Sequence, residues 1–578
     1  MGRRNSSSLS ARSVPIALLL LAAPVRGEQA LAAGLGASAP HGRSPVHSSD
    51  RGMVVSAAPE ASRAGADVLA AGGNAMDAAV ATALALAVVY PQAGNLAGGG
   101  FLLARTPDGV VRALDFRETA PGEATREMFL GPDGRPDPKA STATALAVGT
   151  PGSVRGYAEA HRLLGRLAWS RVVAPAEKLA REGFRVPAGL ARELAEEKEL
   201  LSRWDETRRV LFSGGEPIRE GALLRQPELA DTLARIGREG PDAFHRGEIA
   251  RRLVGFVRSH GGVLSAADLE GYAPVWRPPE EIRFGPLAVY TMPLPSSAGF
   301  LFRSVLGQLE VARGTGPAPL DAEGYHLLLE AARRAYADRN RALGDADCDE
   351  VPLADLLAPA RIAALGAAID AGRATRSSSI PAASREREET THLSVATPDG
   401  FAVSLTTTLN GTFGNGAIVP GTGVLLNNEM DDFAAAPGAP NLYGLVQGAS
   451  NDVRAGARPL SSMAPTIVER DGRPSLVVGA PGGSTIPTTV LQVLLRFHSG
   501  EDLGPAVAAP RLHHQHTPDV VFLERGAVPE ALVRRLSGKG HEMREREPIG
   551  KVHAVAFEPG GRLVGAADPR GYGEPRSP

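Results

Sequence analysis

Thr390 lies in the segment EETTHLSV, residues 388–395, where a polar run gives way to a strand-like pattern. The preceding residues 373–389 read RATRSSSIPAASREREE, with few apolar side chains and no period, so they are expected to be exposed. If the bond between Glu389 and Thr390 were cut, Thr390 would carry a hydroxyl nucleophile and a free α-amine. An α-amine has an unperturbed pKa of about 7.7–8.0 and can take the proton of its own hydroxyl. This residue could then act without a separate histidine base.

The same tripeptide, TTH, has an ordinary structural interpretation, because threonine favours strands and strand ends. The residues that follow read HLSVATPDGFAVSLTTTLNGTFG, with alternating apolar residues on both sides of the turn signal Pro398–Gly400. This pattern predicts a β-hairpin that begins at the candidate nucleophile. The rest of the chain has to decide between the two interpretations.

Helices and strands are predicted in blocks around this hairpin. Residues 75–90 are apolar nearly all round, between Gly72-Gly73-Asn74 and Pro91, which predicts a buried helix. Residues 150–350 have a mainly helical pattern, with strand signals on either side. Fold class is therefore predicted as α+β, with sheets covered by helices.

Two shorter patterns near the N-terminal side could carry chemistry. Gly98–Gly100 have neither spacing of the known phosphate loops, so no nucleotide site is predicted. Residues 111–121, VRALDFRETAP, are predicted to form a strand with Asp115 and Arg117 on one face. From the residues alone, a surface ion pair of little energetic worth is the better interpretation.

Beyond residue 390 the chain is dense in strand and turn signals, with polar clusters directly after apolar runs. Such clusters occur in GVLLNNEMDDF from Gly423, PLSSMAPTIV from Pro459 and PSLVVGAPGGS from Pro474. Strand ends and loops are where sheets present functional residues. RLHHQH, residues 511–516, lacks companion ligands at the spacing of known zinc sites, so no metal site is predicted.

Composition limits the class of function. The chain has 578 residues, of which 43% are hydrophobic and 22% charged, and its net charge is −2. This balance suits a large globular protein and gives no field that would recruit nucleic acid or an anionic membrane, so a small-molecule substrate is expected. Cys348 is the one cysteine, which excludes an internal disulfide and a thiolate metal site.

The N-terminus has the form of a secretory signal peptide. Arg3, Arg4 and Arg12 precede the apolar run 14–25 and the small residues 30–32. Twelve apolar residues are too few for a membrane span, which needs about 20. We expect a signal peptide over residues 1–32, cleaved between 24 and 33, and a periplasmic or secreted protein exported by the Sec or the twin-arginine route.

Taken together, the motifs resemble those of the γ-glutamyltranspeptidase family of N-terminal-nucleophile hydrolases, over nearly the whole mature chain. The motifs are GGNAMDAAVA at Gly72, DFRETAP at Asp115, AYADR at Ala335, TTH at Thr390, TLNGTFG at Thr408, LLNNEMDDF at Leu425, PLSSMAPT at Pro459, GAPGGS at Gly479 and ADPRGYG at Ala567. The resemblance implies a four-layer αββα sandwich and self-cleavage between Glu389 and Thr390. Residues 33–389 would be a large subunit and residues 390–578 a small one, held together as a heterodimer.

The resemblance also implies a role for each site residue. Thr390 would attack the γ-carbonyl group, Thr408 would orient it, and the backbone N–H groups of Gly482 and Gly483 would form the oxyanion hole. The remaining residues would bind the glutamyl group: Arg117, Ser461 and Ser462 its α-carboxylate, Asp432, Glu429 and Asn410 its α-ammonium, and Tyr443 would cover it from a lid loop, residues 434–460.

The function expected from this resemblance is that of a γ-glutamyltransferase and glutathione hydrolase without a cofactor. Glutathione and other γ-glutamyl compounds would be donors, with water, amino acids or peptides as acceptors. Glu429 stands where some relatives have glutamine, which could alter the balance of hydrolysis and transfer. An acylase acting on glutaryl-type side chains and an uncleaved relative that only binds γ-glutamyl compounds are the alternatives.

Overall fold

The computed structural model describes residues 41–314, 316–377, 390–434, 441, 445 and 447–578. The expected signal peptide, Glu389 on one side of the expected cleavage site, and Tyr443 of the expected lid loop lie outside these residues. Among the described residues, no helix is both long and apolar enough to cross a lipid bilayer.

Two antiparallel seven-stranded sheets form the centre of the described structure. The first contains, in spatial order, β23 (Glu574–Arg576), β2 (Met53–Ser56), β12 (Thr390–Ala396), β13 (Ala402–Thr408), β3 (Gly99–Arg105), β4 (Val111–Asp115) and β9 (Val275–Arg277). The second contains β1 (Val46–Ser49), β22 (Leu563–Ala567), β21 (His553–Phe557), β17 (Arg473–Gly479), β16 (Thr466–Arg470), β11 (Leu287–Thr291) and β10 (Glu280–Phe284).

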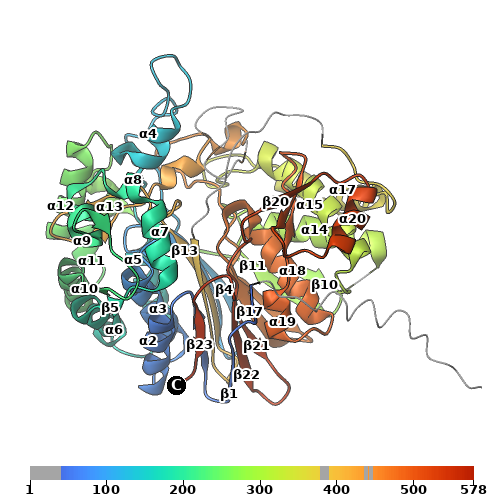
Figure 1. Ribbon diagram of the computed structural model, residues 1–578, viewed down its shortest axis with the longest axis horizontal. Helices are drawn as coiled ribbons and strands as arrows, with labels where there is room; N and C mark the ends of the chain where they lie inside the picture. The colour runs from blue at the N-terminus through green and yellow to red at the C-terminus, as the bar shows by residue number, and fades with distance from the viewer. Residues whose placement is uncertain (1–40, 315, 378–389, 435–440, 442–444, 446) are drawn as a thin grey trace, which may run out of the picture. The chain divides into compact units, whose positions relative to one another are not determined.

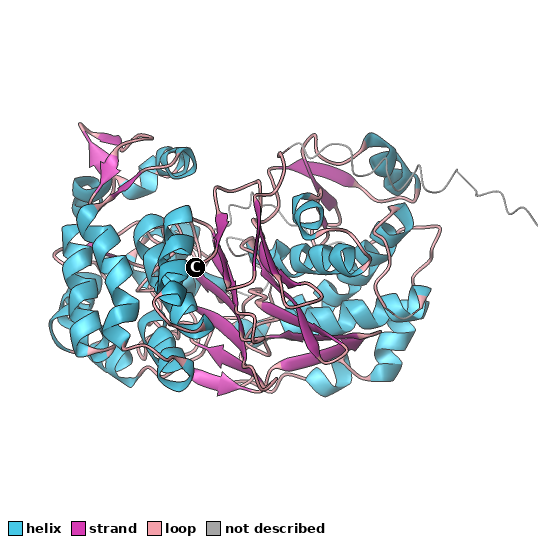
Figure 2. Ribbon diagram, turned by 90° about the horizontal axis from the view of Figure 1, so that it is seen from below, coloured by secondary structure: helices cyan, strands magenta, loops and turns pink. Residues whose placement is uncertain are grey.

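Helices cover the outer face of each sheet, as Figures 1 and 2 show. The helices on the first sheet include α2 (Pro59–Ala70), α3 (Ala75–Val89), α5 (Ser153–Leu164), α6 (Trp169–Glu182), α7 (Ala188–Glu196), α10 (Pro227–Glu239) and α12 (Gly247–Ser259). Those on the second include α14 (Ala298–Arg313), α15 (Ala322–Ala342), α17 (Pro359–Ala367), α18 (Ile486–His498), α19 (Leu503–Ala508) and α20 (Glu530–Gly538). The predicted four-layer αββα sandwich is confirmed.

Alternation along the first sheet divides its apolar side chains between two cores. In β2, Val54 belongs to the core under the first helical layer, whereas Val55 belongs to the core between the sheets. Leu102 and Leu103 of β3 divide in the same way. Successive side chains of a strand point to opposite faces, so both faces of this sheet are covered and its strands have apolar residues on both sides.

The buried helix predicted over residues 75–90 is α3, in which all 15 residues are buried. The Asn74 side chain accepts hydrogen bonds from the backbone N–H groups of Met76 and Asp77, both at 3.0 Å. The Asp77 carboxylate accepts one in return from the N–H of Asn74, at 2.8 Å. This reciprocal capping box explains the GGNAMD motif, because it starts the helix at a fixed residue.

The predicted hairpin is also confirmed. β12 pairs with β13 from Thr390 opposite Thr408 to Ala396 opposite Ala402. Gly400 in the turn has φ +84°, a conformation that glycine adopts without steric cost. The register of the hairpin therefore places the two threonines side by side.

The prediction of a strand over residues 111–121 is wrong in its second half, since β4 ends at Asp115. The Asp115 carboxylate accepts a hydrogen bond from the N–H of Arg117 at 2.9 Å, which turns the chain out of the sheet. Asp115 itself pairs with Arg277 at 2.8 Å and Arg458 at 3.4 Å. Arg117 therefore lies in the loop after the strand, and the expected Asp115–Arg117 surface pair does not form.

Buried histidines make the stability of this fold depend on pH. Burial lowers the pKa of His245, His513 and His541 to about 3 and that of His498, His514 and His553 to about 4. An unfolded histidine has a pKa of about 6.5. Between about pH 4 and 6.5 the unfolded state therefore binds more protons than the folded state. The free energy of unfolding is expected to fall by up to about 1.4 kcal/mol per pH unit for each such histidine as the pH is lowered.

Urea denaturation at pH 6.5, 5.75 and 5.0 measures how steeply the free energy of unfolding changes with pH. Burial raises the pKa of Glu118 to about 7 and also raises the pKa of Glu429 and Asp432, so these carboxyl groups contribute with the opposite sign and offset part of the histidine effect. In the native protein, His245 Nδ1 lies 3.0 Å from the Leu269 carbonyl oxygen, and His245→Gln keeps a hydrogen-bonding group near it. This variant should reduce the change in the free energy of unfolding with pH by the contribution of one histidine. A stability that does not change over this pH range would contradict the assignment of neutral buried histidines.

Candidate active site

Thr390 is the first residue of β12, which lies between β2 and β13 in the first sheet. Only 3% of Thr390 and 3% of Thr408 are exposed. Thr390 is paired with Thr408 of β13, and β12 is also paired with β2 from Leu393 onward. The hydroxyl group is therefore fixed to a rigid element, as a nucleophile requires.

A pocket opens at Thr390. It is lined by Arg117, Arg339, Thr390, Thr408, Glu429, Asp432, Leu445, Leu460, Ser461, Ser462, Met463, Gly483 and Ile486. Eight of these are residues that the sequence singled out: Arg117, Thr390, Thr408, Glu429, Asp432, Ser461, Ser462 and Gly483. The structure thus brings together most of the predicted site from segments far apart in the sequence.

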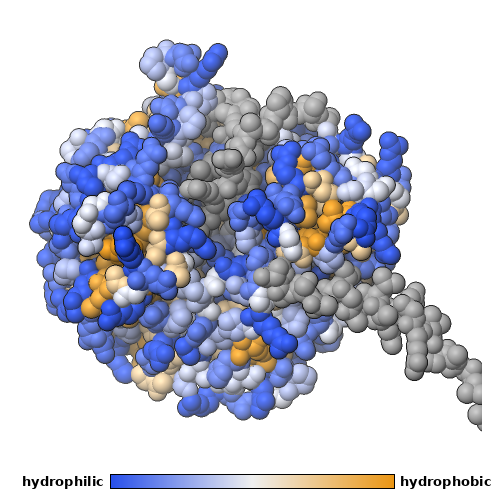
Figure 3. Space-filling view, viewed as in Figure 1, coloured by the Kyte–Doolittle hydropathy of each residue, from blue (hydrophilic) through white to orange (hydrophobic). Residues whose placement is uncertain are grey.

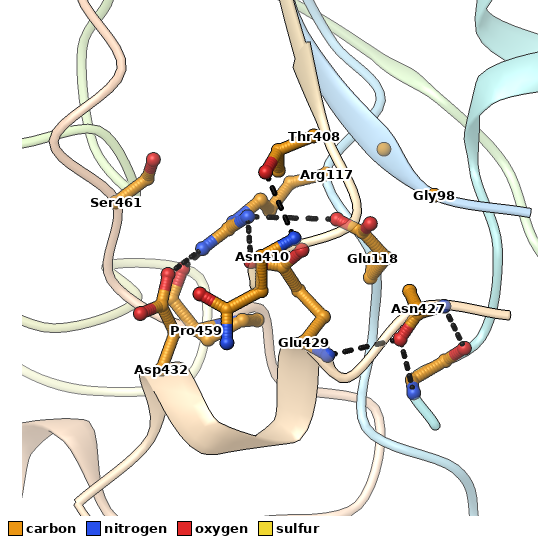
Figure 4. Close-up of polar contacts among 12 residues, drawn as sticks. Gly98, Arg117, Glu118, Thr408, Asn410, Asn427, Glu429, Asp432, Pro459 and Ser461 are labelled. Carbon is orange, nitrogen blue, oxygen red and sulfur yellow. Dashed lines mark hydrogen bonds and ion pairs between the residues drawn. The ribbon is translucent and has the colours of Figure 1, made fainter. Parts of the chain in front are cut away.

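Arg117 is the hub of the charges in this pocket and is fully buried. Its guanidinium group forms ion pairs with both Glu429 and Asp432 and lies 3.6 Å from Glu118, as Figure 4 shows. Glu429 and Asp432 begin and end the short 3₁₀-helix η2 (Glu429–Asp432), so residues three apart present their carboxylates on one side. A planar guanidinium fork can hold two carboxylates at once.

Three buried carboxyl groups surround one guanidinium group, whose single positive charge can balance only one carboxylate. Burial raises the pKa of Glu118 to about 7, and Arg117 opposes this shift. Burial also raises the pKa of Glu429 and Asp432, again against the attraction of Arg117. The pKa of Arg117 is raised by these same carboxylates. A further positive charge beside these carboxyl groups, such as the ammonium group of a ligand, would favour their ionised form.

Asparagine side chains join the loops that carry Thr408 and η2. The N–H of Asn410 donates to the Thr408 hydroxyl at 2.8 Å, and its amide donates to the Asn428 carbonyl at 3.0 Å. The Asn427 amide donates to the Ala97 carbonyl at 2.7 Å, and its oxygen accepts from the N–H of Glu429 at 3.0 Å. Asn410 has φ +75°, which asparagine tolerates better than most residues. The predicted residue Asn410 thus contacts Thr408 but does not line the pocket.

Asn95 is a residue that the sequence interpretation missed. Its amide donates to the Thr408 carbonyl at 2.8 Å and to the Thr407 hydroxyl at 3.0 Å. Its oxygen accepts from the N–H of Gly98 at 2.9 Å. A Cβ atom on Gly98 would lie 2.0 Å from the Thr408 carbonyl oxygen, so the glycine run 98–100 serves close strand packing. The sequence signal that could have identified Asn95 is its position three residues before the glycine run 98–100.

His392 and Gly479 fix β12 against β17 of the other sheet. The His392 ring contacts the Thr406 hydroxyl at 2.9 Å and the Ser394 hydroxyl at 3.0 Å. A Cβ atom on Gly479 would lie 2.4 Å from this ring, so only glycine admits it. The two motifs TTH and GAPGGS are therefore joined by packing, and β17 leads directly to the Gly482-Gly483 loop.

Gly482 and Gly483 differ in backbone conformation and in the cavity that each of them lines. Gly482 has φ +135° and Gly483 φ +46°, just before helix α18. Gly483 lines the pocket with Thr390, whereas Gly482 lines an adjoining groove. The predicted oxyanion-hole residues therefore form the boundary between two cavities.

Arg339, in α15, is a second cation that the interpretation of single residues missed. It lies in the AYADR motif and is buried. Its guanidinium group donates to neutral side chains: the oxygens of Asn340 and Gln447, both at 3.3 Å, and the Ser462 hydroxyl at 3.5 Å. Burial lowers its pKa to about 10. Such an arginine can accept an anionic group of a ligand at little further desolvation cost.

The described part of the expected lid loop supports Asp432. The Asn441 amide donates to the Asp432 carboxylate at 3.2 Å. The side chains of Gln447 and Asn451 donate to the Asp432 backbone carbonyl at 3.0 Å and 2.6 Å. Leu445 lines the pocket. Asn441, Gln447 and Asn451 thus hold the Asp432 end of η2 in place.

The histidines of RLHHQH make contacts within the protein. His513 contacts the Thr488 hydroxyl at 2.7 Å and the Gln515 oxygen at 2.9 Å. His514 lies 3.5 Å from Asp519. Within the described residues, no group of three or more histidine, cysteine, aspartate or glutamate side chains is arranged to hold a metal ion.

Known proteins match this chain over nearly its whole length. The family described as Gamma-glutamyltranspeptidase matches residues 61–577. The glutathione hydrolase proenzyme of Escherichia coli (strain K12) is 43% identical over 525 residues, which are 90% of this chain and 90% of that protein. The family match includes all the residues that line the pocket.

Two solved structures are similar as well. A cephalosporin acylase from Bacillus halodurans has a TM-score of 0.82 and 26% identity, over 93% of this chain and 97% of its own. A γ-glutamyltranspeptidase from Pseudomonas nitroreducens complexed with L-DON has a TM-score of 0.51 and 37% identity, over 55% of this chain and 93% of its own.

The contact between Gly479 and His392 predicts the effect of one added methyl group. Gly479→Ala should lower the free energy of unfolding by about 1–3 kcal/mol, because the His392 ring cannot move without losing two hydrogen bonds. Thermal unfolding followed by circular dichroism measures the change. Gly538→Ala is the matched control, since a Cβ atom there meets nothing within 4 Å. Equal unfolding temperatures for the two variants would contradict the packing role of Gly479.

Proposed function

Because the chain belongs to the γ-glutamyltranspeptidase family, we propose that it is a γ-glutamyltransferase and glutathione hydrolase with Thr390 as its nucleophile. The observation that carries this proposal is the placement of Thr390 at the start of a central strand, in one pocket with Arg117 and Asp432. A nucleophile, a carboxylate-binding cation and an ammonium-binding carboxylate are the groups that an N-terminal-threonine enzyme for γ-glutamyl compounds needs.

The nucleophile would act with its own α-amine as base. The Thr390 hydroxyl adds to the γ-carbonyl carbon while its proton passes to the free amine. The oxygen of the tetrahedral intermediate would accept hydrogen bonds from the N–H groups of Gly482 and Gly483, and loss of one such donor typically costs about 3–4 kcal/mol of barrier. Collapse breaks the C–N bond, and the leaving amine takes the proton from the Thr390 ammonium. Thr408, opposite in register, would orient the hydroxyl.

The resulting γ-glutamyl ester would be resolved by an incoming nucleophile. Water gives glutamate, and the amine of an amino acid or peptide gives a new γ-glutamyl amide. In both cases the incoming group loses a proton to the α-amine of Thr390, and the threonine oxygen takes it back when the ester bond breaks. No cofactor enters this sequence.

The glutamyl group would be recognised through both of its charges. Asp432, with Glu429 and Asn410, would bind its ammonium group. Arg117, Ser461 and Ser462 would bind its carboxylate, and Arg339 supplies a second cation beside Ser462. Arg117 is already paired with two carboxylates, so the entering ammonium would replace it at Asp432 and free one side of its fork. Tyr443 would cover the bound group.

A cut between Glu389 and Thr390 would be required for this chemistry, because it frees the α-amine. The family relative from E. coli is named a proenzyme, which supports such processing. Residues 33–389 and 390–578 would then be the large and small subunits of a heterodimer. The basic and apolar N-terminal run supports a signal peptide over residues 1–32 and a periplasmic or secreted location.

An acylase for glutaryl-type side chains is the second candidate, and the likeness to the cephalosporin acylase supports it. A glutaryl group lacks the α-amine and would leave Asp432 without a ligand partner. The buried carboxylates of η2 therefore favour the γ-glutamyl substrate.

Replacement of Asp432 tests this choice. Asp432→Asn should lower kcat/KM for a γ-glutamyl anilide by about 10²-fold or more, because the ammonium loses its countercharge, and should not lower activity toward a glutaryl anilide. Release of the aniline is followed by absorbance for both substrates. Asp431→Asn is the control, since Asp431 bonds to the Ser141 hydroxyl at 2.6 Å and does not line the pocket. Native enzyme that prefers the glutaryl anilide would establish the acylase instead.

The masses of the polypeptides in the purified protein test whether the chain is cut before Thr390. The native protein should yield a fragment that begins Thr-Thr-His and has roughly one third of the 60.1 kDa of the chain. Thr390→Ala should stay a single inactive chain, which denaturing mass spectrometry and N-terminal sequencing detect. A processed Thr390→Ala protein would mean that another residue starts the cleavage, and a stable uncut native chain would favour a relative that only binds.

A further inference from the structure

The peptide unit between Gly482 and Gly483 needs an outside contact to keep one orientation. Both residues have positive φ, +135° and +46°, and glycine adopts either sign of φ about equally well. The unit is planar and trans, so its carbonyl oxygen and its N–H group point in opposite directions. Half a turn of this unit would reverse the direction of the Gly483 N–H. The proposed oxyanion hole therefore depends on what fixes the Gly482 carbonyl group.

Thr485 holds that carbonyl group with two hydrogen bonds. Its side-chain hydroxyl donates to the Gly482 oxygen at 2.7 Å, and its backbone N–H donates to the same oxygen at 2.8 Å. The N–H bond belongs to the 3₁₀ turn of η4 (Gly483–Thr485), and any residue other than proline could donate it. The hydroxyl bond is specific to the side chain at position 485. With the carbonyl held at the start of α18, the Gly483 N–H points away from this helix.

The polar groups of this turn are buried, so water cannot replace their partners. The residues on the face drawn in Figure 3 are mostly hydrophilic, and surface polar groups of this kind can exchange a lost partner for water. Ser484, Thr485 and Tyr336, in contrast, are each 0% exposed. A buried donor or acceptor that loses its partner pays the full cost of its desolvation. The turn is therefore held in one arrangement as long as its hydrogen bonds are complete.

Two other segments fix Ser484 in the same turn. Tyr336 of α15 donates its hydroxyl to the Ser484 carbonyl, and the Ser484 hydroxyl donates to the Gln515 oxygen at 2.7 Å. The His513 ring lies 2.9 Å from the same Gln515 oxygen and packs edge-on against Tyr336, with ring centroids 5.6 Å apart. Residues of the motifs AYADR and RLHHQH thus meet behind the Gly482-Gly483 loop.

We propose that Thr485 is a positioning residue for the oxyanion hole, whose hydroxyl group holds the Gly482-Gly483 peptide unit with its N–H toward the pocket. Tyr336 and Gln515 hold Ser484, so the turn cannot follow a rotating peptide unit. The inference rests on the proposed function with a threonine nucleophile. Thr485 does not line the pocket and acts only through the Gly483 N–H, which is needed when negative charge develops on the substrate oxygen.

Thr485→Val tests this role, because valine keeps the branched shape of threonine and removes the hydroxyl group. It should lower kcat for a γ-glutamyl anilide about tenfold, less than the roughly 10²–10³-fold that loss of a whole oxyanion donor costs, and leave KM unchanged. Thr485→Ser keeps the hydroxyl and should retain most of the native kcat. Rates are expressed per cut chain, which denaturing mass spectrometry counts.

Thr489→Val is the matched control for this substitution. Thr489 lies four residues further on, in α18, and is also buried. Its hydroxyl has no hydrogen-bond partner among the described residues, so its removal should leave kcat and KM at the native values. A Thr485→Val protein with the same kcat as Thr489→Val would overturn the proposal.

A γ-boronic acid analogue of glutamate separates a positioning role from a purely structural one. Its boron atom bonds to the Thr390 oxygen while the hydroxyl proton passes to the α-amine, which gives a tetrahedral anion like the reaction intermediate. Glutamate forms no such anion and reports ground-state binding. Thr485→Val should weaken binding of the analogue about tenfold in calorimetry and leave that of glutamate unchanged. Equal losses for both ligands, or no loss for either, would contradict the proposal.

Tyr336→Phe gives a second test if the Thr485→Val chain stays uncut. It removes the donor to the Ser484 carbonyl and should weaken the analogue more than glutamate. Tyr325→Phe is its control, because Tyr325 lies in the same helix and donates to the Pro510 carbonyl at 3.1 Å. Equal affinities of the two variants for the analogue would overturn the proposal. Native protein that neither turns over the anilide nor binds glutamate would refute the proposed function itself, whereas variants that match an active native enzyme would refute only this positioning role.

Discussion

The buried ion cluster around Arg117 is the constraint on which the rest of the site depends. A guanidinium group without exposure to water has to be paired, and its partners Glu429 and Asp432 come from a segment more than 300 residues away. Pairing therefore forces the loop after β4 and the helix η2 to meet above Thr390. The asparagines at 410, 427 and 428 complete this junction, because each satisfies backbone groups of a neighbouring loop. A pocket with fixed charges follows from these pairings before any ligand enters.

Local patterns predicted the elements better than they predicted the site. Period-two alternation and a PDG turn were enough to predict the hairpin that begins at Thr390, and a uniformly apolar run was enough to predict α3. The end of β4 was missed because it depends on a hydrogen bond from the Arg117 N–H to the Asp115 carboxylate, which turns the chain out of the sheet. Asn95 and Arg339 were missed because their partners lie far away in the sequence. The association of Arg117 with Asp432 came from resemblance to a family, since no local spacing joins them.

One loop separates two kinds of recognition in this protein. Gly483 faces a small pocket with fixed buried charges, and Gly482 faces a wide groove with mixed charges. A buried, paired site discriminates strongly, because a wrong ligand leaves charges unpaired, whereas a wide and partly exposed groove discriminates weakly. The architecture therefore suits an enzyme that is strict about the acyl group and tolerant about the amine. The same scaffold occurs in an acylase, so the charges of η2, more than the fold, carry the choice of acyl group.

The strand order has a consequence for a chain that is cut before Thr390. Strands β12 and β13 lie between β2 and β3 in one sheet, and β22, β21, β17 and β16 lie between β1 and β11 in the other. The two pieces are thus interleaved in both sheets and cannot separate while either sheet is intact. Once unfolded, however, they would diffuse apart, and recovery of the native state would require an encounter of two molecules. Unfolding of the cut protein would become irreversible on dilution, so its lifetime would be set by the unfolding barrier rather than by an equilibrium.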